Sequence, residues 1–368
     1  MSIEAVALQM TPGLGIKGAV HLLEMFGDAR RIFAASADEL IHRAALRPDV
    51  AEAIRQRKAF AAAEREVRHC ERNHIRILAS TDDAYPTLLR EIPDYPAVLY
   101  LQGDPSTLTG RTLAMVGTRN ASPYGQEECR RLVGGLAERI PDLTIVSGLA
   151  YGVDVAAHRA ALEFGVRTVA VVANALPGVT PAPHNHIARE MLESGGAILT
   201  ELHSQTKQNG AYFLARNRLI AALSVGTIVV ESPAGGGSLN TAAHANGYHR
   251  TVMAVPGRPT DRNALGTNHL IRTHQAQLIT SAEDVIEALA WDFGDAPATF
   301  REKPATEQLT ADEEGLLGCF RTSDPYSIEQ LHELTGLQSG ELTVLLLGLE
   351  LAGKIRLLPG NQYMKLCN

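Results

Sequence analysis

The fold of this chain is decided at residues 143–158, LTIVSGLAYGVDVAAH, where an apolar run of strand length ends at a glycine turn and a helical stretch follows. A run of this kind is typical of a strand that is buried on both faces of a parallel sheet. The pattern of strand-length run and helical stretch recurs at Thr112–Val116, Thr168–Val172, Ile198–Thr200, Thr227–Val230 and Thr251–Val255. This alternation predicts an α/β fold built on a doubly wound, mostly parallel sheet.

The residues before this alternating region are more helical. Val20–Phe26 places its apolar residues on one face, and residues 51–67 are rich in helix formers. Residues 12–17, PGLGIK, are typical of a helix–hairpin–helix turn, which offers backbone N–H groups to DNA phosphates, and equally of a plain turn between helices. We therefore predict an N-terminal helical domain at 1–75 and an α/β domain at 76–290. The first part of the latter, 76–110, is a proline-containing connector with short strands at Ile75–Leu78 and Val98–Leu101.

The residues after the alternating region predict a small separate domain. Residues 291–308 are polar and proline-containing, as a linker is. Within 309–368, two helices are predicted at Ser327–Leu334 and Ser339–Leu349, followed by a hairpin of Lys354–Leu357 with Tyr363–Leu366. This order predicts a winged helix-turn-helix.

Composition limits the class of protein. The chain has 368 residues and a net charge of -7, which by itself disfavours a nucleic-acid partner. However, residues 203–280 hold seven Lys or Arg against two Asp or Glu, whereas residues 281–368 hold six against fifteen. The four cysteines (Cys70, Cys129, Cys319, Cys367) fit no metal-binding spacing, so we expect free thiols and no metal. No secretory signal and no membrane-spanning run are evident, so we expect a soluble, cytoplasmic protein without membrane insertion.

Ligands of doubly wound sheets bind where the strands end, so the residues after each strand are candidate ligands. Gly117, Thr118 and Arg119 follow the strand 112–116, where small residues let backbone N–H groups approach an anion and Arg119 supplies a forked cation. Ser147, Gly148 and Gly152 follow the strand 143–146. The next residues include Asp154 and His158, which share one helix face; this pair suits an acid–base or metal site but more often braces a helix.

Two further segments predict contacts with phosphate. Arg216, Asn217 and Arg218 precede a predicted helix at Leu219–Leu223. Because the two arginines are two positions apart, they cannot share a helix face, and we expect one to reach the ligand and the other to brace the helix. Residues 235–238, GGGS, with Thr241, form the strongest phosphate-cradling pattern, in which Gly236, Gly237 and Ser238 supply backbone donors at a helix start. The segment lacks the Gly-Lys-Ser/Thr ending of an ATP-binding loop, so no cofactor is expected.

Taken together, these motifs resemble those of the DprA/Smf family of DNA-processing proteins. The match includes residues 117–119 with Tyr124-Gly125, residues 147–158, residues 213–218, residues 237–241, Val255-Pro256-Gly257, and Asn268 with Leu270-Ile271, in order across about residues 80–290. The resemblance implies an extended Rossmann-like domain that binds single-stranded DNA through a positive pocket, lined here by Arg119, Arg216 and the turn at 236–238. It also implies a non-catalytic homodimer that loads RecA during natural transformation, with single-strand-binding protein as a further partner.

The sequence departs from the family pattern after the strand 168–172. Ala173-Asn174-Ala175-Leu176-Pro177 stands where the family has a glycine-rich turn, which puts the loop 173–186 in doubt as a phosphate contact. Leu214, Gly236 and Asn240 also differ from the usual residues. His184-Asn185-His186 is interpreted as ordinary polar sequence near a helix start because no acidic cluster accompanies it.

An enzymatic alternative is a nucleotide-binding or phosphoribohydrolase-type protein on a related Rossmann-like fold. Its Pro-Gly-Gly-x-Gly-Thr turn is similar to residues 233–238, but residues 240–243 supply no catalytic carboxylate.

If the ligand is single-stranded DNA, we expect its unpaired bases to stack on Tyr124, Tyr151 or Phe213. The second helix of the winged domain is flanked by Glu341 and Glu350 and has no Lys or Arg, so we expect it to contact protein rather than duplex DNA.

Overall fold

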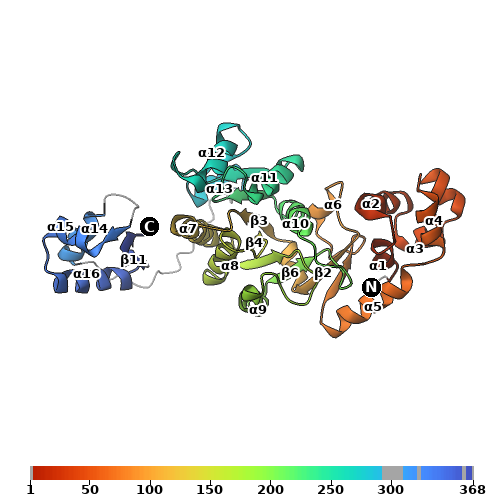
Figure 1. The fold of residues 1–368 in the computed structure, drawn as a ribbon, viewed down its shortest axis with the longest axis horizontal. Helices are drawn as coiled ribbons and strands as arrows, with labels where there is room; N and C mark the ends of the chain where they lie inside the picture. Colours follow the sequence, from red (N-terminus) through yellow and green to blue (C-terminus); the bar gives the residue numbers. More distant parts are fainter. Residues whose placement is uncertain (1–2, 292–309, 321–324, 359–361, 367–368) are drawn as a thin grey trace. The chain divides into compact units, whose positions relative to one another are not determined.

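The structure is a computed structural model that describes residues 3–291, 310–320, 325–358 and 362–366 (Figure 1). The chain divides into two compact units, Met1–Gly294 and Asp295–Asn368. The predicted linker 291–308 lies, except for Trp291, outside the described residues. No helix in the described ranges is both long and apolar enough to cross a membrane.

The first unit is built on one nine-stranded sheet with the strand order β1-β2-β6-β5-β4-β3-β7-β8-β9. The strands from β6 to β9 pair in parallel, while β1 and β2 pair antiparallel at one edge. The prediction of a mostly parallel sheet is therefore confirmed. The strands are β1 Arg76–Ala79, β2 Val98–Gly103, β3 Arg111–Val116, β4 Leu143–Ser147, β5 Arg167–Val171, β6 Ala197–Thr200, β7 Gly226–Val229, β8 Thr251–Ala254 and β9 Gln277–Leu278.

Helices cover both faces of this sheet because alternate strand residues point to opposite sides. Leu113 and Met115 pack under α7, α8 and α13, whereas Ala114 and Val116 pack on the side of α10, α11 and α12. The helices around the sheet are α6 Thr87–Arg90, α7 Pro123–Arg139, α8 Val153–Glu163, α9 Asn185–Glu193, α10 Ala211–Ala222, α11 Gly237–Gly247, α12 Leu265–Arg272 and α13 Ala282–Ala288, with the short helical turns η2 Pro105–Leu108, η3 Ala182–His184 and η4 Arg262–Ala264.

The N-terminal helices pack against the antiparallel edge of the sheet and share a hydrophobic core with it. Gln9 Nε2 donates to Glu201 O at 2.8 Å, and Ser204 N donates to Glu66 at 2.8 Å. These helices therefore belong to the first compact unit, and a domain boundary at residue 75 stays a prediction. They are α1 Ile3–Gln9, α2 Gly15–Phe26, α3 Ala29–Ala34, η1 Glu39–Arg43, α4 Pro48–Arg55 and α5 Phe60–Arg72.

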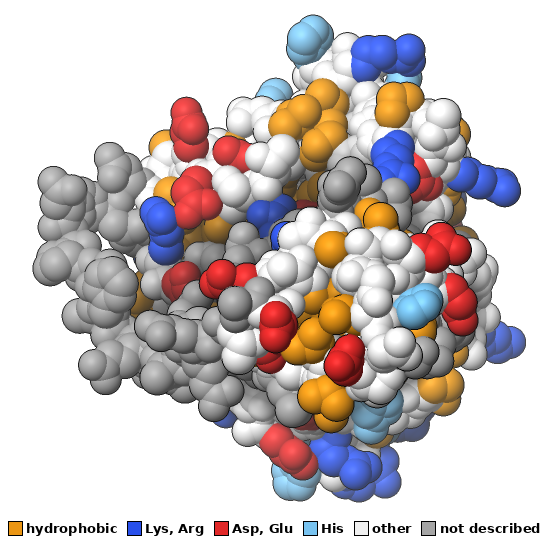
Figure 2. Space-filling model, turned by 90° about the vertical axis from the view of Figure 1, so that its left-hand side faces the viewer, with side chains coloured by type: hydrophobic (Ala, Val, Ile, Leu, Met, Phe, Trp, Pro, Cys, Tyr) orange, Lys and Arg blue, Asp and Glu red, His pale blue; other side chains and the backbone are white. Residues whose placement is uncertain are grey.

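The predicted winged helix is confirmed: the described residues of the second unit form the two predicted helices and the hairpin, together with an additional helix, α14, before them. Its core contains Leu331, Leu342, Leu346 and Leu349. Val344 and Leu347 of α16 are 69% and 56% exposed, so this helix is apolar on its outward face as well. One face of the molecule likewise shows hydrophobic side chains exposed next to acidic ones (Figure 2). The elements are α14 Ala311–Gly318, β10 Tyr326–Ser327, α15 Ile328–Thr335, α16 Ser339–Leu351, β11 Ile355–Leu358 and β12 Gln362–Lys365.

Candidate nucleic-acid interface

A cavity of about 630 Å³ lies where the central parallel strands end. The loops after β3, β4 and β7 form its walls together with the first turns of α10, as expected for a doubly wound sheet. The cavity brings together predicted site residues from three distant segments of the sequence. These are Gly117, Thr118, Arg119, Arg216, Asn217, Gly236, Gly237, Ser238 and Thr241.

Arg119 is the exposed cation of the cavity wall. Its guanidinium carbon lies 5.6 Å from the centre of the Phe213 ring, which also lines the cavity. A cation over an aromatic face holds the guanidinium in place without neutralising its charge. The pair can therefore offer both a phosphate contact and an apolar surface for a base.

Arg216 is buried, with 6% of its surface exposed. Its Nη1 donates to Gly148 O at 2.8 Å and also to Val171 O, so the side chain joins the ends of β4 and β5. Burial lowers the pKa of the Arg216 guanidinium to about 10, against the effect of the Asp154 carboxylate, which raises it. Arg216 is therefore still a cation at neutral pH, and it also fixes the geometry of the cavity floor.

Asp154, the second residue of α8, also lines the cavity, although its functional place was not predicted. Its carboxylate accepts a long hydrogen bond from Ala150 N at 3.4 Å. Burial raises the pKa of Asp154 above its ordinary value, and the charge of Arg216 acts in the opposite direction. The sequence indicates this residue through its spacing from His158, which is more typical of a helix brace, and through its place in the motif at residues 147–158.

His158, one turn after Asp154 on α8, is fully buried and does not line the cavity. Its Nδ1 is 2.7 Å from Thr168 Oγ1, and that hydroxyl donates to Ile145 O at 2.9 Å. Because the Thr168 hydroxyl uses its own hydrogen for Ile145 O, its oxygen accepts a hydrogen bond from Nδ1–H, which places a proton on Nδ1. Burial lowers the pKa of His158 to about 3, so the ring braces the helix without charge.

Three further predicted residues shape the cavity without being among the residues that line it. Ser147 is buried, and its hydroxyl donates to Met115 O at 2.6 Å. A Cβ on Gly148 would lie 2.4 Å from Arg216 Nη1, and Gly152, at φ 78°, would place a Cβ 2.2 Å from Thr118 O. The two glycines thus permit contacts that a side chain would prevent. A direct role in binding for these three residues stays a prediction.

Arg218 points away from the cavity, because α10 starts at Ala211 and places residues two positions apart on different sides. The prediction that Arg216, Asn217 and Arg218 precede the helix is therefore wrong, because all three lie within α10. Arg218 is 5% exposed, forms an ion pair with Glu201, and lies 3.6 Å from Asp94 Oδ2. Of the two arginines, Arg216 reaches the cavity and Arg218 braces the helix.

The start of α11 supplies backbone donors to the cavity. Gly237, Ser238 and Leu239 occupy the first turn; Leu239 N donates to Gly236 O at 3.1 Å, whereas the N–H groups of Gly237 and Ser238 point out of the helix start, where a helix offers no acceptor. Ser238 Oγ donates to Ser232 Oγ at 2.9 Å, which holds the turn, and Asn217 Nδ2 donates to Gly237 O at 3.4 Å. A helix start of this kind favours anionic ligands.

Glu231, at the end of β7, was not singled out from the sequence although it organises the loops beside the cavity. It is 3% exposed and accepts from Ser122 N at 2.8 Å and from Ser122 Oγ at 2.6 Å. Its carbonyl accepts from Thr118 N at 2.7 Å. Glu231 therefore fixes the start of α7 and the turn that carries Arg119.

The remaining sequence candidates lie elsewhere. His184 Nδ1 and His186 Nδ1 contact Leu149 O and Pro183 O, each at 2.8 Å, as ordinary polar residues do. The described residues contain no cluster of three or more potential metal ligands. Asn240, one turn into α11, carries no carboxylate, as the sequence indicated. Tyr124 and Tyr151 are 40% and 49% exposed, outside the cavity lining.

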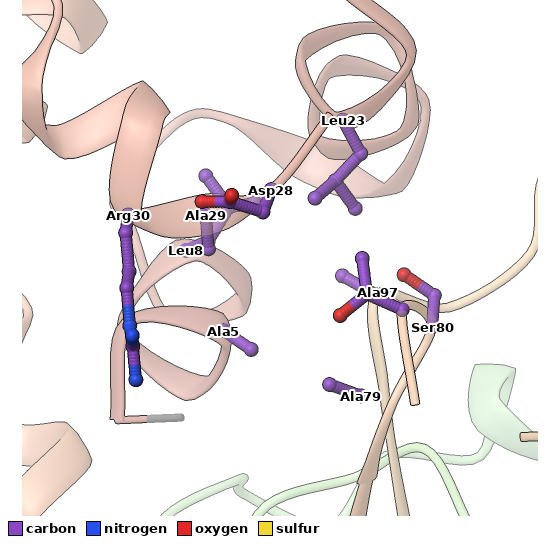
Figure 3. A pocket seen from close by; sticks show the side chains of 10 residues that line it. Ala5, Leu8, Leu23, Asp28, Ala29, Arg30, Ala79, Ser80 and Ala97 are labelled. Carbon is purple, nitrogen blue, oxygen red and sulfur yellow. The ribbon is translucent and has the colours of Figure 1, made fainter. Parts of the chain in front are cut away.

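Two smaller cavities lie outside this site. One of about 190 Å³ separates the N-terminal helices from the antiparallel strands, where Leu8, Leu23 and Ala97 line it with Asp28 and Ser80 (Figure 3). Another of about 380 Å³ lies in the loop after β5 and is lined by neutral residues such as Asn174, Asn185 and Gln208.

Known proteins resemble this chain over most of its length. "Protein Smf" of Escherichia coli is 34% identical over 298 residues, which is 80% of this chain and 78% of that protein. The crystal structure of DNA processing protein A from Streptococcus pneumoniae matches with a TM-score of 0.64 and 29% identity, over 78% of this chain and 98% of that one. The protein of the same name from Helicobacter pylori, whose structure concerns its binding of single-stranded DNA, matches with a TM-score of 0.53 and 30% identity, over 60% and 97%.

Two family matches agree with the division of the fold. Residues 300–361 match the DprA winged helix domain. Residues 76–290, which contain the sheet and the cavity, match DNA recombination-mediator protein A. The chain therefore belongs to the DNA recombination-mediator protein A (DprA/Smf) family, as the sequence motifs indicated.

Proposed function

We propose that this protein binds single-stranded DNA in the cytoplasm as a non-catalytic recombination mediator. In this role it protects incoming strands and helps load RecA during natural transformation. The observation that carries the proposal is the meeting of Arg119, Arg216 and the start of α11 in one cavity at the ends of the strands. Single-stranded DNA binding by the Helicobacter pylori protein, which is 30% identical, supports the same ligand.

The chemistry of the cavity suits a flexible anion with an apolar component. Arg119 and the N–H groups of Gly237 and Ser238 hold phosphate oxygens, and the Phe213 ring offers a face for one base. A duplex keeps its bases paired and stacked, so it cannot place a base on that ring without paying for unstacking. We therefore expect a preference for single strands, and affinity that falls steeply with salt as counterions are released.

The test is fluorescence anisotropy with a labelled oligonucleotide, single-stranded or annealed to its complement, at low and high salt. Tighter binding of the single strand, weakened by salt, is the expected result. Equal affinity for the two forms would contradict the proposal.

RecA loading and the dimer need separate measurements. We expect the protein to accelerate RecA-dependent strand exchange on single strands coated with single-strand-binding protein. Sedimentation should give twice the mass of one chain. If the protein binds the single strand but leaves RecA activity unchanged, single-stranded DNA is still its ligand, and the mediator role is contradicted.

A further inference from the structure

The loop after β8 continues the edge that carries the cavity. Because β8 lies beside β7, residues 255–264 lie next to the cavity loops. Asn263 Nδ2 donates to Asn120 O at 3.0 Å, and Ser232 N donates to Asn263 O at 2.6 Å. Asn120 directly follows Arg119, so this loop is joined to the segment that carries the exposed cation of the cavity.

The joined loop is positively charged at its surface. Arg258 and Arg262 are both exposed, and Arg262 forms no ion pair with any residue in the described ranges. Asp261 lies between them, and its carboxylate accepts from Asn263 N at 2.9 Å, which fixes the turn. The loop therefore adds a net positive charge to the surface beyond the cavity.

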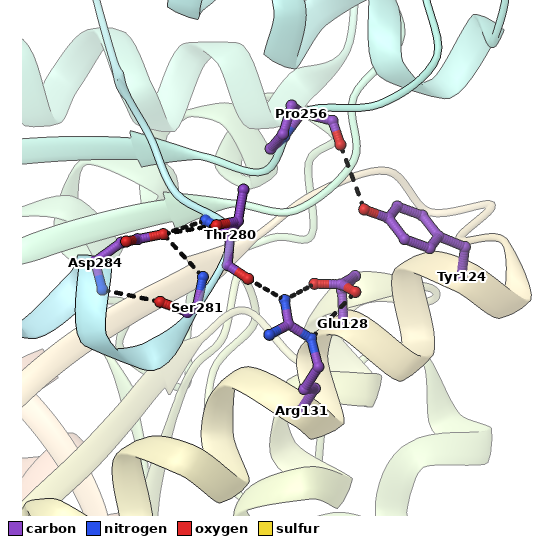
Figure 4. A network of polar contacts seen from close by, with 7 residues as sticks. All are labelled: Tyr124, Glu128, Arg131, Pro256, Thr280, Ser281 and Asp284. Atoms are coloured by element: carbon purple, nitrogen blue, oxygen red, sulfur yellow. Dashed lines mark hydrogen bonds and ion pairs between the residues drawn. The ribbon is translucent and has the colours of Figure 1, made fainter. Parts of the chain in front are cut away.

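An aromatic ring lies at the start of the same loop. Tyr124, in the first turn of α7, donates from its hydroxyl to Pro256 O at 3.3 Å (Figure 4). This contact holds the side chain against the loop while 40% of the residue stays exposed. An exposed, fixed ring beside arginines is the combination that binds an unpaired nucleotide, with stacking for the base and charge for the phosphate.

The opposite side of the cavity has a different character. There β5 lies beside β4, and the loop after β5, residues 172–186, contains no Asp, Glu, Lys or Arg. The Asn174 and Asn185 amides hydrogen-bond the backbone of that same loop. Lys207, between two residues that line the cavity of about 380 Å³, is an exposed cation on this side.

We propose that the DNA strand leaves the cavity across the β8 side, where Arg262 and Arg258 contact phosphates and the Tyr124 ring stacks on a base. This inference rests on the proposed function and adds to it the route of the strand and a second set of contacts. The ligand of this surface is the sugar–phosphate chain of an unpaired polynucleotide that has already entered the cavity.

The first experiment measures salt dependence. Anisotropy with a labelled oligothymidine of about 16 nucleotides is recorded over a series of salt concentrations for the full chain. Each lost phosphate contact reduces the magnitude of the slope of log K against log salt by about 0.7. Arg262→Ala should therefore reduce this magnitude by about 0.7, and the double variant with Arg258→Ala should reduce it by about twice as much. Lys207→Ala, on the opposite side, should keep the wild-type slope.

The second experiment tests the ring. Tyr124→Ala should weaken binding about fivefold or more, because stacking on an aromatic side chain is lost. Tyr124→Phe keeps the ring and should bind nearly as the wild type does. Equal weakening by both variants would assign the effect to the hydroxyl contact with Pro256 and would remove the stacking role.

Arg119→Glu, measured in the same series, separates this inference from the proposed function. If Arg119→Glu loses binding while the Arg258 and Arg262 variants keep the wild-type slope, the cavity binds DNA and the proposed route is wrong. The route is equally wrong if Lys207→Ala lowers the slope in their place. Wild-type binding by Arg119→Glu would overturn the proposed function itself.

Discussion

At the scale of single residues, the two arginines of the cavity are placed differently. Arg119 is exposed, and its side chain contacts the Phe213 ring on the cavity wall, so its substitution disturbs little of the fold. We expect Arg119→Glu to lose most single-strand binding while the melting temperature stays within a few degrees of the wild type. Arg159→Glu, a charge reversal at an exposed position of α8, is the matched control and should bind normally.

Arg216 is a structural residue as well as a cation. It is buried and donates to two carbonyl oxygens, and a hydrogen bond to a charged group contributes about 1.5–3 kcal/mol. Arg216→Ala should therefore lower the free energy of unfolding by several kcal/mol, measured by urea denaturation, and also weaken binding. If the variant were as stable as the wild type, the Arg216 side chain would not be needed to hold the ends of β4 and β5 together.

His158 predicts a pH dependence of stability. Because burial lowers its pKa from 6.5 to about 3, the unfolded chain binds more protons than the folded chain between these values. The stability is fully present above pH 6.5 and falls on acidification by about 1.4 kcal/mol per pH unit. His158→Gln should remove this slope, so that the loss between pH 7 and pH 5 is about 2 kcal/mol smaller than in the wild type. Urea denaturation at the two pH values measures it; identical slopes would contradict a buried neutral ring.

At the scale of elements, the start of α11 is the part most sensitive to a small change. A Cβ on Gly237 meets no atom within 4 Å, so Gly237→Ala should fold normally yet stand between the ligand and the N–H groups of the first turn. Gly247, at the last turn of the same helix, is equally open. Gly247→Ala should bind DNA normally, whereas Gly237→Ala should bind weakly in the same anisotropy assay. Equal affinities would mean that phosphate does not approach this turn.

The strands of the sheet could be predicted closely from the sequence because their apolar runs are bounded by polar turns. The predicted run 143–146 became β4 Leu143–Ser147, and the other five runs shifted by at most one residue at an end. The start of α10 could not be predicted. Arg216 and Arg218 inside a helix look like solvated residues, and only the tertiary partners Gly148 and Glu201 explain their burial. The two-residue β9 has no apolar run of its own.

The site could be predicted in part, because most of its residues follow directly after strands. The turn at 117–119 and the start of α11 were found in this way. Glu231 was missed, and Asp154 was interpreted mainly as a helix brace, since each depends on a partner far away in the sequence, Ser122 and Arg216 respectively. Ser147 is predicted as a ligand because it follows the strand 143–146; its hydroxyl donates to Met115 O, and a direct role in binding stays a prediction.

At the scale of the whole molecule, the division into two units predicts a separable function. All residues that line the candidate cavity belong to the first unit, and the helix α16 of the second unit carries no Lys or Arg. Removal of residues 295–368 should therefore leave single-strand affinity within about threefold of the full chain. Anisotropy measures it, with thermal unfolding as the control for the first unit. A large loss would give the winged helix a direct part in binding.

The outer edge of the sheet at β9 limits how copies of this protein can join. A strand of two exposed residues presents too few unpaired backbone groups to template another strand. A neighbouring molecule therefore gains little by extending the sheet there, and fibril-like growth from this edge is disfavoured. A partner that binds at the β9 edge must instead be recognised through side chains. Single substitutions at this edge can therefore change which partner binds.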